Sequence, residues 1–350
     1  MEQAITNNKL NTIGARNIIV IGASAGGLPA INEVVTGLSV DMDIVVIVVI
    51  HVSRKSNSQH IVNSFQRNTA LRCEVAVNDM PLQKGHLYVA PPEHQLMVKN
   101  NKLRLTSGPH ENKYRPSIDV LFRSAAVHYG HRTIGLILTG LFEDGTSGMH
   151  AIKRCGGLCI IQDPMEAQFS DMPRSVLNKI QVDYQAKLKD IPEIIKKIIT
   201  DPLPPETPVP QGIRIEAELT EQMMTDINEI KKIADHSDFT CPDCGGGLWA
   251  VKNDPLHRYR CHTGHVYTQN RLHDLQDKNI EESVWVSIRM LEEKENLLLL
   301  MAKRENADGD MVLSSFHEER LAEVRKHINR FRSLLSLLNE DLHKSLPAPE

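Results

Sequence analysis

The sequence contains no apolar run of the roughly 18 residues that a membrane-spanning helix needs. Residues 1–17 are polar and carry no apolar segment of the kind found in signal peptides. Positive charge is not in excess either, because 40 Lys and Arg residues stand against 44 Asp and Glu residues, a formal net charge of −4. These absences argue against membrane insertion, export and nucleic-acid binding, and we expect a cytoplasmic protein.

Cysteine is scarce, with six residues in a chain of 350. Cys73, Cys155 and Cys159 lie in apolar stretches and are expected to be reduced core residues. The length of the chain predicts two or three domains.

A loop rich in small residues follows the first apolar segment. Residues 20–27 read Val-Ile-Gly-Ala-Ser-Ala-Gly-Gly, between a predicted strand at 18–21 and a predicted helix at 28–38. Ser24 is therefore expected at the carboxyl end of a strand, beside a helix N-terminus that favours negative charge. Such a loop can cradle a phosphate or present a serine nucleophile, and the loop alone does not separate the two.

The next strand lacks the acidic residue that a dinucleotide-binding fold places at its end to hold a ribose. The apolar run at 44–50 is typical of a strand buried in a parallel sheet, and it ends in His51. Neighbouring parallel strands open onto one crevice, so His51 can lie beside Ser24 as a base. The alternative is a strand-end histidine bonded to a backbone carbonyl.

A third strand, predicted at 133–138, leads into a glycine-rich loop that contains Asp144. Serine, histidine and aspartate thus stand at three strand ends, as in sites where aspartate orients a histidine that deprotonates serine. Asp144 can instead form a turn or cap a helix. The pattern predicts a doubly wound, mostly parallel α/β sheet with helices on both faces, of Rossmann-like type.

Several segments together resemble the catalytic domain of the CheB family of chemotaxis protein-glutamate methylesterases, over roughly residues 16–200. They are 18–27, His51, Tyr114-Arg-Pro-Ser-Ile-Asp-Val-Leu-Phe122, Leu138-Thr-Gly-Leu-Phe-Glu-Asp-Gly145 and Met172-Pro-Arg174. The resemblance implies that Ser24 is the nucleophile, His51 its base and Asp144 the residue that orients the base. It also implies a backbone oxyanion donor at Leu141, and we expect a second near Ala25.

The reaction implied is hydrolysis of a glutamyl γ-methyl ester to glutamate and methanol, without a cofactor. The expected partner is a methyl-accepting receptor or another methylated signalling protein, and the same site can deamidate glutamine. The alternative is a non-catalytic adaptor that keeps the esterase fold and binds partners through its C-terminal modules.

The chain departs from the family pattern in three places. Ala25 stands where a threonine is frequent, and Phe142 replaces a glycine that is usual in the aspartate loop. Full-length regulators of the family also carry an N-terminal phosphoacceptor domain, whereas only polar residues precede the first strand here. We therefore expect a stand-alone form that is not regulated by phosphorylation in cis.

Arg115 precedes a helix that is predicted to begin near Pro116. An arginine in such a loop can orient a carboxylate product. A surface position or an ion pair is the alternative.

A proline-rich stretch marks the end of the predicted catalytic domain. The predicted organisation is a polar tail at 1–16, the catalytic domain at 17–200, a linker at 201–215, a helix and zinc module at 216–270, and a helical hairpin at 271–345. The helix of the zinc module is expected at 218–234.

Two cysteine-containing knuckles follow that helix. Cys241-Pro-Asp-Cys244 and Cys261-His-Thr-Gly-His265 supply three thiolates and an imidazole for a tetrahedral zinc ion, with His262 as a less favoured substitute for His265. Because a four-ligand site leaves no position open, the zinc is predicted to be structural.

Two amphipathic helices make up the C-terminal part, with a break at Asn306-Ala-Asp-Gly309. A hairpin of two helices cannot bury both apolar stripes by itself, so it is expected to pack on the zinc module or to form a homodimer. Recognition of a partner helix is the alternative.

Overall fold

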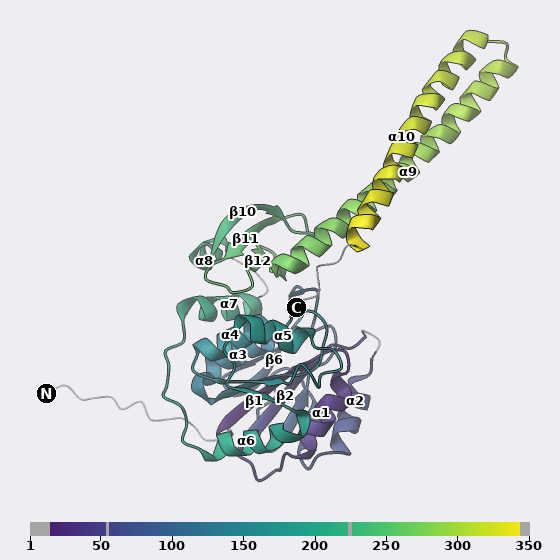
Figure 1. Ribbon diagram of the computed structural model, residues 1–350. Helices are drawn as coiled ribbons and strands as arrows, with labels where there is room; N and C mark the ends of the chain where they lie inside the picture. Colours follow the sequence, from purple (N-terminus) through teal and green to yellow (C-terminus); the bar gives the residue numbers. More distant parts are fainter. Residues whose placement is uncertain (1–14, 54–55, 223–225, 344–350) are drawn as a thin grey trace. The chain divides into compact units, whose positions relative to one another are not determined.

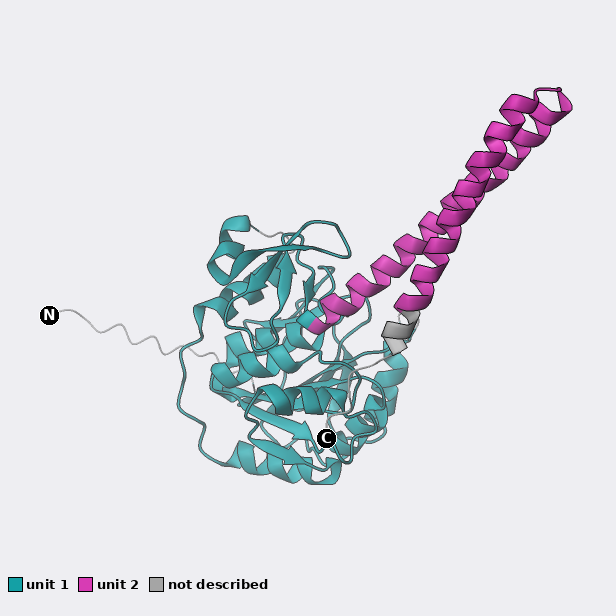
Figure 2. Ribbon diagram, turned by 45° about the horizontal axis from the view of Figure 1, so that its top comes forward, with its two compact units in different colours: residues 1–269 teal, residues 270–350 magenta. Residues whose placement is uncertain are grey.

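A computed structural model describes residues 15–53, 56–222 and 226–343 (Figure 1). The chain divides into two compact units, residues 1–269 and residues 270–350 (Figure 2). The predicted polar tail lies outside the described residues except for Ala15 and Arg16. All residues predicted for catalysis or metal binding belong to the first unit.

A seven-stranded sheet forms the centre of the first unit, in the order β3-β4-β2-β1-β7-β8-β9, and every neighbouring pair is parallel. The strands are β1 (Asn17–Ala23), β2 (Ile44–Ile50), β3 (Arg72–Val75), β4 (His86–Val89), β7 (Thr133–Ile137), β8 (Leu158–Gln162) and β9 (Tyr184–Ala186). From β1 the chain goes first to β2 on one side and later to β7 on the other. The carboxyl ends of these three strands therefore form the switch point, where such sheets bind their ligands.

Alternate side chains of β1 enter two separate cores. Ile18 and Val20 pack in the core that contains Phe122, whereas Ile19 and Ile21 pack in the core that contains Phe65. The first core is covered by α3 (Ile118–Tyr129), α4 (Thr146–Arg154) and α5 (Asp171–Lys179), and the second by α1 (Gly27–Thr36), α2 (Ser58–Gln66) and α6 (Ile191–Thr200). The predicted α/β fold with helices on both faces is confirmed.

Smaller elements complete this layer structure. They are the antiparallel pair β5 (Gln95–Lys99) and β6 (Lys102–Thr106) and the 3-10 turns η1 (Gly130–Arg132) and η2 (Leu188–Asp190). Cys73, Cys155 and Cys159 are buried free thiols, as predicted. Burial raises the pKa of Cys73 and of Cys155 to about 11, so these thiols stay protonated at neutral pH and are poor nucleophiles.

The remainder of the first unit is a small antiparallel sheet with two helices. Its elements are α7 (Gln211–Gln222), α8 (Ile227–Ile233), β10 (Ala234–Thr240), β11 (Gly247–Val251), β12 (Tyr259–Cys261) and β13 (Val266–Tyr267). The single helix predicted at 218–234 is wrong, since α7 begins earlier and strand β10 starts at Ala234. The carbonyl of Pro210 accepts hydrogen bonds from Ile213 and Arg214. A proline-rich segment can run directly into a helix because the first turn needs no N–H from the preceding residues.

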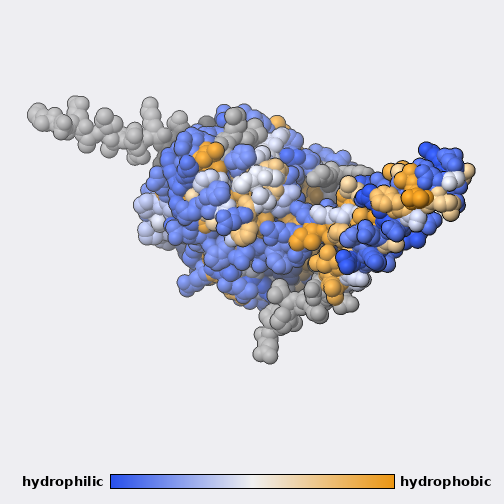
Figure 3. Space-filling view, turned by 90° about the horizontal axis from the view of Figure 1, so that it is seen from above, coloured by the Kyte–Doolittle hydropathy of each residue, from blue (hydrophilic) through white to orange (hydrophobic). Residues whose placement is uncertain are grey.

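The second unit is the predicted helical hairpin, and its presence is confirmed. Helix α9 (Gln269–Ala307) and helix α10 (Met311–His343) pack through two apolar clusters, one around Leu298 and Val324 and one around Ile288 and Leu335. Apolar side chains also remain exposed on both helices (Figure 3). Within the described part of the chain, every helix is too short or too polar to cross a bilayer.

Candidate active site

Ser24 follows β1, where the chain turns sharply into α1. Its backbone N–H donates to the carbonyl of Thr139, which ties the serine loop to the end of β7. Gly26 has a left-handed φ of 73°, a conformation that other residues adopt with strain. In the described residues the Ser24 hydroxyl forms no hydrogen bond, so it is available for chemistry.

His51 occupies the equivalent position after the neighbouring strand. Ala23 pairs with Ile50, and the N–H of His51 donates to the carbonyl of Ala23, at 3.0 Å. Ser24 and His51 are therefore adjacent across two parallel strands, which lie about 4.8 Å apart. The sheet thus brings the two strand ends together, while in the described residues no hydrogen bond joins the Ser24 hydroxyl to the imidazole, and the use of His51 as the base of Ser24 stays a prediction.

The imidazole of His51 is held on two sides. Its Nε2 lies 3.0 Å from Oδ2 of Asp144, and its ring stacks on Tyr114 with centroids 3.6 Å apart. Nδ1 is buried and has no hydrogen-bond partner in the part of the chain that the structure describes. With the proton on Nε2, Nδ1 carries a free lone pair and can act as a base.

Asp144 is buried and surrounded by donors. Besides His51, it accepts the backbone N–H of Ile118 at 2.7 Å and the hydroxyl of Ser117 at 2.9 Å. Burial by itself raises the pKa of Asp144, but the hydrogen bonds from His51, Ile118 and Ser117 outweigh it and hold the pKa below its ordinary value. Asp144 is therefore a carboxylate and can stabilise a protonated His51.

A second buried carboxyl lies beside it. Burial, and then the charge of Asp144, raise the pKa of Asp119 well above its usual value, which favours the protonated form. Asp119 accepts the N–H of Gly148 at 2.6 Å and a side-chain N–H of Asn112 at 3.2 Å. The surroundings of the two acids therefore shift their pKa values in opposite directions.

Gly140 allows the β7 loop to pass close to Ser24. A Cβ at this position would lie 2.9 Å from Cβ of Ser24 and 2.0 Å from Sδ of Met172. In the described residues the N–H groups of Ala25 and Leu141 have no acceptor, in keeping with their predicted use as oxyanion donors.

Phe142 adopts a left-handed φ of 65°, which explains why a glycine is usual at this position. Its side chain is 48% exposed, so little packing compensates the strain. A left-handed residue other than glycine costs about 1–2 kcal/mol.

Phe142→Gly is expected to raise the free energy of unfolding by up to about 1 kcal/mol, because relief of the left-handed strain exceeds the added entropy of the unfolded chain. Leu141→Gly is the matched control, since Leu141 is also exposed but has no positive φ. It is expected to lower the free energy of unfolding by about 0.5–1 kcal/mol. Urea denaturation measures the free energy of unfolding of both variants. An equal decrease in this free energy for Phe142→Gly and Leu141→Gly would contradict the explanation by left-handed strain.

Arg115 is engaged by the fold. Its guanidinium pairs with Glu93 at 3.0 Å and donates to the carbonyls of Ser107 and Gly108. It also lines a cavity of about 110 Å³ together with His51 and Tyr114. The ion-pair alternative therefore has a structural basis, and contact with substrate stays a prediction.

Three residues with direct contacts in the site were not predicted for these roles. Ser117, Tyr114 and Asn112 were given no function in the site. For Ser117 and Tyr114 a signal was present, because both lie in the segment 114–122 that carries the family resemblance. For Asn112 the sequence offers none.

The four predicted zinc ligands come together in the turn before β11, at the end of β12 and in the turn before β13. Sγ of Cys244 lies 3.8 Å from Sγ of Cys261, and Nδ1 of His265 lies 3.6 Å from Sγ of Cys261 and 3.7 Å from Sγ of Cys241. All four ligand atoms lie within 4.8 Å of one another. A tetrahedron with zinc–sulfur bonds of about 2.3 Å has edges of about 3.8 Å, so the donor set fits zinc.

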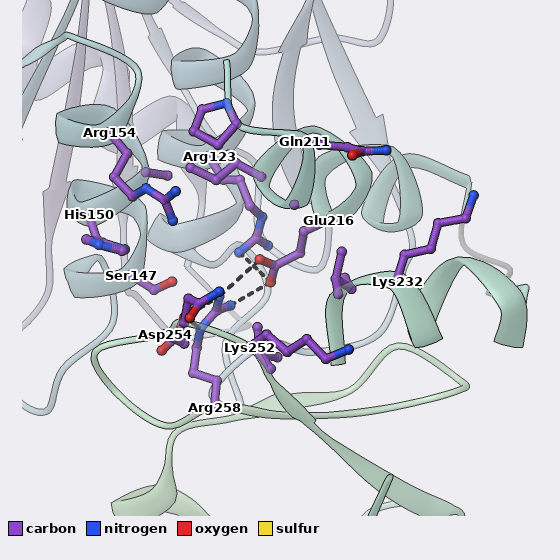
Figure 4. A pocket seen from close by; sticks show the side chains of 17 residues that line it. Arg123, Ser147, His150, Arg154, Gln211, Glu216, Lys232, Lys252, Asp254 and Arg258 are labelled. Atoms are coloured by element: carbon purple, nitrogen blue, oxygen red, sulfur yellow. Dashed lines mark hydrogen bonds and ion pairs between the residues drawn. The ribbon is translucent and has the colours of Figure 1, made fainter. Parts of the chain in front are cut away.

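A buried ionic cluster joins α3 to the C-terminal part of the same unit. Both carboxylate oxygens of Glu111 accept from Arg123, at 2.8 and 2.7 Å, and Arg123 lies 3.0 Å from Glu216. Glu216 in turn accepts two hydrogen bonds from Arg258, which also pairs with Asp254 at 2.7 Å. Most of these side chains line a cavity of about 270 Å³, where Arg123 and Arg258 point toward Glu216 (Figure 4). The catalytic layers and the cysteine-containing sheet therefore share one buried cluster.

Comparison with known proteins gives a consistent result. The model of the CheB methylesterase family matches residues 19–195. A Leptospira interrogans protein named as a protein-glutamate methylesterase/protein-glutamine glutaminase is 35% identical over 181 residues, which is 51% of this chain and 93% of that protein. A Burkholderia pseudomallei protein with the corresponding name is 35% identical over 199 residues, and the match covers 53% of this chain and only 51% of that protein.

Among solved structures, the Thermotoga maritima CheB methylesterase catalytic domain is similar. It superposes with a TM-score of 0.50 and 28% sequence identity, covering 53% of this chain and 98% of that domain. The resemblance predicted from the motifs is thus confirmed for the part of the chain that carries Ser24, His51 and Asp144.

Proposed function

Because the chain belongs to the CheB methylesterase family, we propose that it is a serine hydrolase that removes γ-methyl esters from glutamate residues of methylated signalling proteins. One observation supports the assignment of roles above all others. Ser24, His51 and Asp144 occupy the carboxyl ends of three neighbouring strands, with the His51–Asp144 contact already formed.

In the first half of the proposed reaction, Nδ1 of His51 takes the proton of Ser24 while Oγ attacks the ester carbonyl. Asp144 stabilises the imidazolium through its contact with Nε2. The N–H groups of Ala25 and Leu141 hold the oxyanion, each such donor being worth about 3–4 kcal/mol. The protonated His51 then donates to the departing methoxide, which leaves as methanol.

In the second half, water attacks the acyl-enzyme with His51 again acting as the base. The products are a glutamate side chain and free Ser24. The steps need no metal or cofactor. The names of the relatives also include glutaminase activity, and the same steps release ammonia from a glutamine side chain, although less readily because ammonia is a harder leaving group.

The substrate class we propose is a methyl-accepting receptor or a related methylated protein in the cytoplasm. A non-catalytic adaptor is not proposed, because no observation favours it. Homodimerisation through α9 and α10 stays a prediction, for which their exposed apolar side chains, such as Met290 and Leu300, are the only support.

Methanol release from a peptide that carries a glutamyl γ-methyl ester tests the proposed activity, beside ammonia release from the matching glutamine peptide. The expected result is enzyme-dependent methanol release that exceeds ammonia release. Methanol release no faster than the uncatalysed reaction would contradict the proposal.

We also propose that Cys241, Cys244, Cys261 and His265 bind one structural zinc ion. Protein purified without chelator is expected to contain about one equivalent of zinc, and Cys244→Ser to lose most of it and to melt at a lower temperature. Cys73→Ser is the control, since Cys73 is a free cysteine outside the cluster. Less than half an equivalent in the parent protein would contradict the site.

A further inference from the structure

The loop before α3 pairs with the edge of the cysteine-containing sheet. The N–H of Asn112 donates to the carbonyl of Val266 at 2.8 Å, and the N–H of Val266 faces the carbonyl of His110 at 3.4 Å. Glu111 and Val266 thus form a parallel bridge, directly after His265. Strand β13 of the proposed zinc module therefore pairs with the loop that leads into α3 and the active site.

The side chain of Asn112 connects that strand to the catalytic acid. Its Oδ1 accepts the N–H of Thr268 at 3.2 Å, and its Nδ2 faces Asp119 at 3.2 Å and Oδ1 of Asp144 at 3.5 Å. A backbone N–H can only donate, so Thr268 fixes which end of the amide points to the two acids. Without the hydrogen bond from Thr268, the side-chain amide of Asn112 can rotate and present its oxygen to the two acids instead of its nitrogen.

Thr268 also contacts the loop that carries Asp144. Its hydroxyl lies 2.9 Å from Oε1 of Glu143, the residue before Asp144. Thr268 is itself almost fully buried. Thr268, which directly follows β13, therefore contacts the aspartate loop directly, through Glu143, and indirectly, through Asn112.

We propose that Asn112 and Thr268 are positioning residues for Asp144. We propose further that ester hydrolysis depends on the metal bound by Cys241, Cys244, Cys261 and His265, which together form the cysteine–histidine knuckle. The proposal rests on the proposed function, because it assigns the control of that same site. Asn112 and Thr268 touch neither substrate nor the reacting atoms; they act through the carboxylate that orients His51.

Metal binding at the knuckle can affect the active site because both turns of the knuckle contact the loop that carries Glu111, Asn112 and Lys113. His265 precedes the paired residue Val266, and Asp243, between two of the cysteines, forms an ion pair with Lys113. Asp243 also accepts the hydroxyl of Tyr267 at 2.6 Å. A metal that orders these turns therefore orders both Val266, which pairs with Asn112, and Asp243, which pairs with Lys113.

The experiment compares two pairs of variants in the full chain. Asn112→Ala is matched by Asn100→Ala, because Asn112 and Asn100 both have a left-handed backbone, with φ of 52° and 49°, and Asn100 is exposed and remote from the site. Thr268→Val is matched by Thr268→Ser, which keeps the hydroxyl. kcat and KM are measured with the methyl-ester peptide, and kcat is divided by the fraction of sites that a fluorophosphonate labels.

Asn112→Ala is expected to lower kcat at least about ten-fold and to leave KM nearly unchanged, because a donor near a buried carboxylate is lost. Thr268→Val is expected to lower kcat several-fold, with Thr268→Ser close to the parent and Asn100→Ala indistinguishable from it. A purely structural role would lower the labelled fraction and leave kcat per labelled site unchanged, which would overturn the proposal.

Removal of zinc supplies a readout that does not depend on activity. Chelation is expected to accelerate hydrogen exchange of residues 141–146 in the parent protein, and Asn112→Ala is expected to show faster exchange there even with zinc bound. Unchanged exchange in both cases would overturn the coupling. If the parent and Ser24→Ala release methanol equally, the proposed function fails instead, and the exchange measurement still decides whether the knuckle holds the loop.

Discussion

Ser24→Ala is expected to lower kcat for methyl-ester hydrolysis by about 10⁶-fold, the scale of loss when a catalytic serine is removed from a triad. The physical reason is that no other side chain in the proposed mechanism forms the acyl-enzyme. His51 and Asp144 keep their contact in this variant, so the fold is expected to be unaffected. Methanol release under saturating substrate measures the loss.

Asp144→Asn tests the next member of the triad and is expected to lower kcat by about 10³–10⁴-fold. The substitution removes the negative charge that stabilises the protonated His51 while keeping the size of the side chain. Asp119→Asn is the matched control, since Asp119 is equally buried but its raised pKa favours the neutral form, so that this substitution changes the local charge less. It is expected to lower kcat at most about ten-fold, and similar losses in the two variants would contradict the assignment.

Glu216→Ala is expected to have the largest effect on stability, lowering the free energy of unfolding by about 3–5 kcal/mol. Glu216 is buried between Arg123 and Arg258, and its removal leaves each of these two buried guanidinium groups with one carboxylate partner fewer. Glu218→Ala is the control, because Glu218 lies on the same helix but is exposed. Its expected change is within about 0.5 kcal/mol.

The effect of Glu216 also has a defined pH dependence. Burial alone raises the pKa of Glu216, but the charges of Arg123 and then Arg258 hold it below the ordinary value. Its stabilisation is therefore present above the unfolded-state pKa of about 4.3 and is lost as the pH falls toward the folded value. Chemical denaturation is expected to show that the difference in free energy of unfolding between the parent and Glu216→Ala becomes smaller as the pH falls from 7 to 3. A difference that grows instead would contradict the ionic explanation.

The central strands, and the positions of Ser24, His51 and Asp144 at their carboxyl ends, were predictable because their signals are local. A run such as Ile44–Ile50 is apolar at every position, which only a strand buried on both faces requires, and its observed bounds match the predicted ones. Ser24, His51 and Asp144 follow directly from this, since parallel strands place their carboxyl ends at one edge. The left-handed backbone of Phe142 was likewise signalled by the glycine expected there.

The surroundings of Asp144 were not predictable to the same degree. Ser117 reaches the carboxylate only because α3 begins beneath the aspartate loop, and Asn112 and Thr268 meet only because a loop pairs with β13. Such contacts depend on how distant segments pack, which the spacing of residues does not encode. The proline-rich stretch indicated a change of module, but it held no sign that Glu216 would share a buried cluster with Arg123.

The most direct test of the central claim, that Ser24 is the nucleophile, is stepwise labelling of the protein with a fluorophosphonate. After each step the labelled site is identified by mass spectrometry of peptides and the remaining methanol release is measured. The predicted result is a single adduct on Ser24, with methanol release falling in proportion to the labelled fraction and with protection by the methyl-ester peptide. An adduct at another residue, or full methanol release from completely labelled protein, would contradict the proposed mechanism.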